Sequence, residues 1–110
     1  MKKDNQIYLG HILECIDSIF TYTYGMNLQK FLENKMVVDA VCRNLEIIGE
    51  AAKNIDKEFT DSHPHISWKR IAGLRDKLIH DYIGVDTKRI WNIVENQLPD
   101  LQKEIEKRLK

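Results

Sequence analysis

The residues best suited to chemistry lie between Arg75 and Tyr82, in the run Arg-Asp-Lys-Leu-Ile-His-Asp-Tyr. Arginine carries a permanent charge on a planar fork that fits a phosphate, and histidine can move a proton near neutral pH. Asp76 precedes His80 by four residues, so on a helix its carboxylate could orient or charge-stabilise the imidazole. Tyr82 follows Arg75 by seven residues and shares its face if the helix continues. The run is therefore a candidate site for phosphate binding and proton transfer.

The spacing also leaves a purely structural interpretation open. On a straight helix, Arg75 and His80 point about 140° apart, so one helix does not bring them together. On generic grounds, a salt bridge between helices explains these charges better than catalysis does. Between His63 and Ile90, six Lys or Arg accompany three Asp, an excess that could attract a phosphate, although a solvated helix face explains it equally well. The formal net charge of 0 argues against nucleic-acid binding through bulk charge.

Four helical segments must position these residues. Apolar side chains that recur every three and four residues predict helices over about 5–24, 34–59, 68–82 and 87–109. The start and stop signals are Asp4 or Asn5 and Gly25 for the first helix, Ser67 for the third and Asp86 for the fourth. Residues 60–65 form a loop, and Pro99 should kink or split the last helix. We expect an all-α, antiparallel bundle of four to five helices.

The predicted central helix has an unusually wide apolar face. Two adjacent rows, one from Val38 to Phe59 and one from Val37 to Ala51, together cover an arc of roughly 160°. The extra width could belong to a deep core, or to a core face plus a subunit interface.

Length and composition exclude several classes of protein. A chain of 110 residues, 43% hydrophobic and 31% charged, is expected to form one domain over residues 1–110. It has no apolar run long enough to span a membrane, and no signal peptide is apparent at its start. Cys15 and Cys42 are too few for a disulfide scaffold and are expected to be reduced, partly buried thiols. We therefore expect a cytoplasmic protein.

The wider sequence resembles the HepT-like branch of the HEPN superfamily, over nearly the whole chain. The pieces that carry the resemblance are, in chain order, Arg43 to Ala52 (RNLEIIGEAA), Ser67-Trp68 to Leu74-Arg75, His80-Asp81-Tyr82, Trp91 and Leu98-Pro99-Asp100-Leu101. The resemblance implies an all-helical homodimer encoded beside a minimal nucleotidyltransferase. In such pairs the HEPN protein is a metal-independent RNase toxin, and the nucleotidyltransferase is its antitoxin.

The resemblance also assigns roles to individual residues. Arg75 and His80 match the catalytic Arg…His motif of the family, and Asp76 occupies the polar position after the arginine, where Asn is common. Tyr82 matches the tyrosine that the partner modifies with AMP in some members. Arg43 and Glu50, seven residues apart on one helix face, are expected to pair with another helix and could support the site from behind it.

The chemistry of RNA cleavage leads independently to a dimer. Without a metal, the reaction needs a base for the 2′-hydroxyl, an acid for the leaving oxygen and positive charge at the phosphorane. One chain offers a single well-placed histidine, whereas a two-fold dimer brings two copies of Arg75 and His80 into one cleft. This argument agrees with the dimer that the resemblance implies. From the resemblance we further expect an RNase toxin of a type VII-like toxin–antitoxin pair, silenced by AMP addition to Tyr82.

Two other functions remain open from the sequence. One is a non-catalytic dimeric subunit that presents nucleotide or substrate to a nucleotidyltransferase, and the other is a structural helical dimer. We expect no cofactor and no metal site, because His63 and His65 flank Pro64 without a ligand motif such as H-E-x-x-H. Trp68 and Trp91 both fit apolar rows and are expected in the core rather than as base-stacking platforms.

Overall fold

The computed structural model describes residues 3–80 and 86–109, with only the backbone described for Lys3, Ile79 and His80. Within these residues every regular element is a helix and no strand occurs, which confirms the predicted all-α class. None of the described helices has both the length and the apolar character that a membrane crossing requires.

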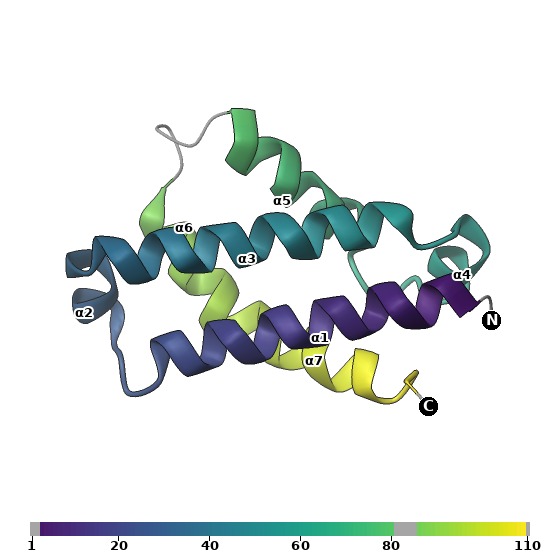
Figure 1. Cartoon of the computed structure of the whole chain (residues 1–110), viewed down its shortest axis with the longest axis horizontal. Coiled ribbons are helices and arrows are strands. Elements are labelled where there is room, and N and C mark those ends of the chain that lie inside the picture. Colours follow the sequence, from purple (N-terminus) through teal and green to yellow (C-terminus); the bar gives the residue numbers. More distant parts are fainter. Residues whose placement is uncertain (1–2, 81–85, 110) are drawn as a thin grey trace.

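Two long antiparallel helices, α1 (Lys3–Thr23) and α3 (Lys35–Asn54), pack along each other across the middle of the bundle (Figure 1). The short helix α2 (Leu28–Glu33) connects them and places the fully buried Phe31 against Trp91, with 5.0 Å between ring centroids. Gly25 has a φ of +76°, a left-handed conformation that glycine adopts without strain, so α1 ends where the sequence predicts.

The prediction of one continuous central helix to Phe59 is wrong. The chain leaves α3 at Ile55, whose backbone is extended, and Asp56 then caps a separate short helix α4 (Lys57–Asp61) by accepting a hydrogen bond from Phe59 N. Asn5 is not a helix cap either: it lies inside α1, 2% exposed, and exchanges two hydrogen bonds with Asp56 at 3.0 and 3.1 Å. This contact, across 51 residues of sequence, favours the break over continued helix.

The C-terminal third contains α5 (Trp68–His80), α6 (Thr87–Asn92), the π-helix η1 (Ile93–Gln97) and α7 (Leu98–Glu106). Asp86 caps α6 as predicted, accepting from Lys88 N at 3.0 Å. Pro99 cannot donate the α-helical hydrogen bond and its ring would meet the preceding turn, so the helix widens there, and Leu98 N donates to Ile93 O instead. The expected interruption at Pro99 is therefore present as a π-helical turn.

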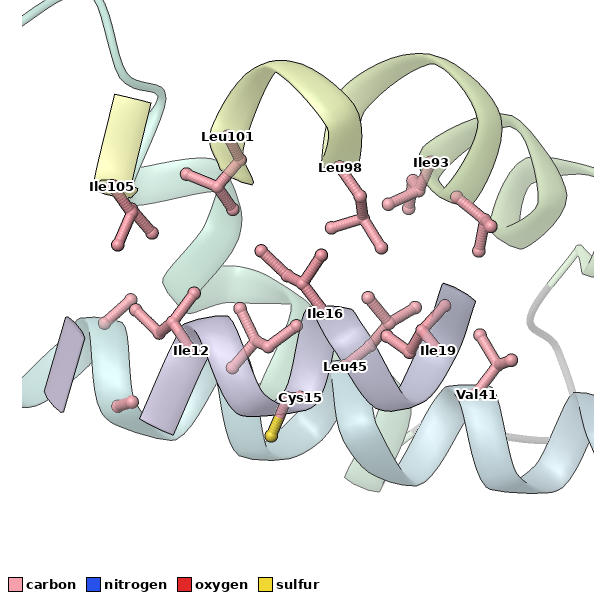
Figure 2. Close-up of a cluster of buried hydrophobic side chains, with 14 of the residues drawn as sticks. Ile12, Cys15, Ile16, Ile19, Val41, Leu45, Ile93, Leu98, Leu101 and Ile105 are labelled. Atoms are coloured by element: carbon pink, nitrogen blue, oxygen red, sulfur yellow. The ribbon is translucent and has the colours of Figure 1, made fainter. Parts of the chain in front are cut away.

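The core lies between the α1–α3 pair and the segment from η1 to α7. Figure 2 shows isoleucines of α1 facing the side chains of that segment, with α3 closing the cluster from the side. Trp68 and Trp91 are 9% and 8% exposed, which confirms both as core residues. The side chains labelled in Figure 2 are Ile12, Cys15, Ile16, Ile19, Val41, Leu45, Ile93, Leu98, Leu101 and Ile105.

The two apolar rows of α3 have different environments. Val41, Leu45 and Ile48 of the first row are buried, whereas the second row keeps partial exposure at Val37 and Ile47. A partly buried apolar strip therefore lies on α3 beside the closed core.

Candidate functional site

Arg75 lies where α3 and α5 cross, and Gly49 allows the two helices to approach there. A Cβ atom at position 49 would lie 2.8 Å from both the Cβ and the N of Arg75, and 3.0 Å from Ile71 O. Only glycine fits this separation without moving a backbone. The crossing therefore fixes the Cα of Arg75 against the middle of α3.

Arg75 is then held by two carboxylates. Its Nε lies 2.7 Å from Glu50 Oε2 on α3, and its Nη1 donates a hydrogen bond to Asp76 Oδ1 at 3.0 Å. Lys53 Nζ donates to the same Asp76 oxygen at 2.7 Å. The Arg75 side chain is 35% exposed, so it is partly accessible at the helix crossing. These four residues, Glu50, Lys53, Arg75 and Asp76, form what we call the crossing cluster.

The electrostatics of the crossing cluster favour ionised carboxylates. The hydrogen bond from Lys53, followed by that from Arg75, holds the pKa of Asp76 below its ordinary value. The positive charges of Lys53 and Arg75 balance the negative charges of Glu50 and Asp76. The described ion pairs of Arg75 use Nε and Nη1, so the remaining edge of the guanidinium, at Nη2, can donate to a further anion. The cluster thus orients a guanidinium whose remaining edge suits a phosphate oxygen.

The structure brings together three of the residues that the sequence singles out: Arg75, Asp76 and Glu50. Glu50 makes the expected ion pair to another helix. Arg43 instead pairs with Glu46 of its own helix at 3.2 Å, outside the crossing cluster.

Two of the predicted site residues, His80 and Tyr82, cannot be placed fully in the site. His80 is the last residue of α5, and its side chain lies outside the described part; Tyr82 lies outside it entirely. Because α5 is helical from Arg75 to His80, their Cα atoms lie about 140° apart around its axis. The suggested contact between Asp76 and His80 therefore stays a prediction, and the described contacts of Asp76 are to Lys53 and Arg75.

Sequence reasoning did not identify Lys53 or Gly49 as site residues. Lys53 meets Asp76 across 23 residues and between two helices, which no local spacing reveals. Gly49 stands inside the motif Ile47-Ile48-Gly49-Glu50, and a glycine in the interior of a predicted helix is the one local signal for a close helix contact.

The loop histidines have structural partners. The His63 ring stacks on Phe59 with 4.2 Å between centroids, and its Nδ1 lies 2.9 Å from Phe59 O. His65 Nε2 lies 2.8 Å from Glu104 Oε2 on α7. Among the described residues, no group of three His, Cys, Asp or Glu side chains could hold a metal ion.

Comparison with known proteins places this chain in a family. The family model "Ribonuclease HepT-like" matches residues 12–108. Two proteins of Methanocaldococcus jannaschii, both named as candidate RNases, are 44% and 43% identical over 99% of this chain and over 90% and 94% of their own lengths. A protein of Thermococcus cleftensis named as a probable ribonuclease HepT is 44% identical over 97% of both chains. No solved structure gives a significant match. Both the family model and these near full-length identities show that the chain belongs to the HepT-like ribonucleases of the HEPN superfamily.

Proposed function

We propose that this protein is a metal-independent endoribonuclease that works as a homodimer and forms the toxin of a toxin–antitoxin pair. The observation that carries the proposal is the crossing cluster, in which Glu50 and Asp76 hold the guanidinium of Arg75 at the surface of the helix that ends at His80. Family membership supports the reaction class, and the cluster supports the assignment of Arg75.

The proposed reaction is an in-line transfer within RNA. A base removes the proton of a ribose 2′-hydroxyl, and the 2′-oxygen attacks the neighbouring phosphorus. The P–O5′ bond breaks as an acid protonates the leaving 5′-oxygen, giving a 2′,3′-cyclic phosphate and a 5′-hydroxyl end. Arg75 stabilises the charge on the phosphorane oxygens through the donors that Glu50 and Asp76 do not occupy.

A homodimer supplies the acid and the base together. The separation of Arg75 and His80 around α5 gives one chain a poor composite site. Two copies of α5 related by a two-fold axis would place the arginine of one chain near the histidine of the other, so one His80 acts as base and the second as acid. The partly buried strip on α3, which includes Val37 and Ile47, is a candidate contact surface for the second chain.

The test is cleavage of a single-stranded RNA by purified protein in EDTA. We expect His80→Ala and Arg75→Ala each to reduce the rate at least about 100-fold, the usual contribution of a proton-transfer or charge-stabilising group. Arg70→Ala is the matched control, since Arg70 is an exposed arginine of the same helix outside the crossing cluster. Circular dichroism and sedimentation should match wild type for all three variants.

Two results would contradict the proposal. Activity that requires a divalent ion, or that survives His80→Ala, would overturn the mechanism. If the wild-type protein cleaves no RNA but raises the activity of a partner nucleotidyltransferase, the protein is instead an accessory binding subunit.

We further propose that AMP addition to Tyr82 by a partner nucleotidyltransferase silences the enzyme. The tyrosine oxygen attacks the α-phosphorus of ATP and pyrophosphate leaves, so the side chain gains a bulky phosphodiester with a negative charge. Tyr82 follows His80 by two residues in sequence, and a charge there would compete with RNA for Arg75.

Intact mass before and after incubation with the nucleotidyltransferase and ATP tests this step. Wild type should gain the mass of AMP, and Tyr82→Phe should not. Tyr24→Phe is the control, because Tyr24 is 91% exposed and would be the acceptor if accessibility alone decided. Equal gain in wild type and Tyr82→Phe would place the acceptor elsewhere, and no gain in any of them would leave complex formation as the antitoxin mechanism.

A further inference from the structure

An open hollow of about 740 Å³ lies beside the crossing cluster, where the end of α3, helix α4 and the start of α5 meet. Its charged lining is mostly basic. Lys53, Lys57 and Lys69 line it with a single carboxylate, Asp61. Because Lys53 pairs with Asp76 and Lys57 pairs with Asp61, Lys69 leaves an excess of one positive charge among the described residues. In a chain of zero net charge such a local excess is a specific feature rather than a reflection of overall charge.

Lys57 and Lys69 differ in their ion pairs. Lys57 pairs with Asp61 at 2.6 Å, but both side chains are largely exposed, at 86% and 62%, so this pair is weak and easily exchanged for another anion. Lys69 is exposed on the first turn of α5 and has no ion pair within the described residues. The hollow therefore presents ammonium groups that can bind a polyanion.

Lys53 connects the hollow to the crossing cluster. Lys53 lines the hollow and also donates to Asp76, which in turn accepts from Arg75. On α5, Lys69, Ala72 and Asp76 step by three and four residues and so share one face, along which Lys69 and Asp76 are roughly 10 Å apart. A chain that places one phosphate at Arg75 can reach the hollow along this face with its next few phosphates.

We propose that this hollow is an RNA-backbone subsite, in which Lys57 and Lys69 bind phosphates that flank the scissile one. The inference rests on the proposed RNase function, since it takes Arg75 as the site of the scissile phosphate. The occupant is RNA rather than an acidic protein segment, because Lys53 belongs both to the hollow and to the crossing cluster, which holds the guanidinium proposed to bind the reacting phosphate. Lys57 and Lys69 set substrate affinity and minimum RNA length, and they take no part in bond breaking.

The experiment measures binding of a fluorescent oligouridylate to the His80→Ala protein across a range of salt concentrations. For single-stranded RNA, each phosphate that a lysine no longer neutralises reduces the steepness of log K against log salt by about 0.7. The double variant Lys57→Gln/Lys69→Gln should therefore reduce the steepness by roughly 1.4 and raise Kd, and should leave binding of a dinucleotide unchanged.

The chain offers a matched control in Lys35→Gln/Lys30→Gln. Lys35 pairs with Asp39 four residues on, as Lys57 does with Asp61, and Lys30, like Lys69, is exposed in the first turn of its helix. This control should keep the wild-type slope. Equal slopes for the two double variants would overturn the proposal, as would displacement of the RNA by an acidic peptide that binds more tightly through the same lysines.

The failure of the proposed function is distinguishable from the failure of this inference. In protein that keeps the wild-type His80, the Lys57→Gln/Lys69→Gln substitutions should raise KM for long RNA and preserve kcat. Wild-type protein that binds RNA through Lys57 and Lys69 but does not cleave it would refute the RNase mechanism and support the subsite.

Discussion

Replacing Gly49 with alanine should destabilise this protein, although the same change at another helical glycine should stabilise it. A new Cβ at position 49 would lie 2.8 Å from Arg75 N and 3.0 Å from Ile71 O, both of them backbone atoms that cannot rotate away. At Gly10, in the middle of α1, the new Cβ would meet nothing within 4 Å. Both variants exchange glycine for alanine inside a helix, so the difference between them isolates the α3–α5 contact.

The expected magnitudes have opposite signs. Alanine gains about 1 kcal/mol over glycine in a helix interior, so Gly10→Ala should raise Tm by about 4 °C in a domain of this size. At Gly49 the same gain is set against an overpacking strain of about 2–3 kcal/mol, because the helices themselves must separate. The net effect is a destabilisation of roughly 1–2 kcal/mol and a fall in Tm of about 4–8 °C.

The separation should also displace Arg75. A shift of about 1 Å in a catalytic group can reduce a rate on the order of 100-fold, so Gly49→Ala should lose most RNA cleavage at temperatures where it is fully folded. Thermal melting by circular dichroism at one fixed protein concentration gives the stabilities, since the Tm of the proposed dimer would depend on concentration. A Gly49→Ala protein that melts as high as Gly10→Ala, or that cleaves RNA at the wild-type rate, would refute the close-contact argument.

Other parts of the structure lead to three further predictions. Burial raises the pKa of the Cys42 thiol to about 11, so iodoacetamide near pH 8 should label native Cys42 far more slowly than the unfolded chain, as peptide mass would show. Leu45→Ala removes a fully buried side chain and should cost about 2–5 kcal/mol in urea unfolding, whereas a loss below about 1 kcal/mol would contradict its place in the core. The lowered pKa of Asp76 stabilises the fold above the ordinary carboxyl pKa, and this contribution disappears as pH falls through the lowered folded-state value. When the pH is lowered below about 4, the Tm of Asp76→Asn should therefore fall less than that of wild type. An identical dependence of Tm on pH in the two proteins would show that folding does not stabilise the carboxylate.

The helical class and most helix positions follow from the sequence, because they depend on local signals. Apolar periodicity places α1, α3, α5 and the C-terminal segment, Gly25 ends α1, and Asp86 caps α6. The interruption before Pro99 also follows from sequence, since a missing N–H group acts within its own turn. The family likewise follows from motifs that are readable along the chain.

The three-dimensional contacts between helices decided the rest. The periodic pattern from Asn34 to Phe59 continues without a gap, yet α3 ends at Asn54 because Asp56 pairs with Asn5 from α1 while capping α4. Local patterns carry no information about such a partner 51 residues away.

The candidate site divides in the same way. Sequence identified Arg75 and its neighbour Asp76, because a motif is a local property. It also offered Glu50 as a residue that could support the site. The tertiary structure showed that Glu50 reaches Arg75 and that Lys53 joins it through Asp76, because both contacts depend on the helix crossing at Gly49. Residue types along the chain determine which groups could do chemistry, and the separation of two packed helices determines which of them are close enough to act together.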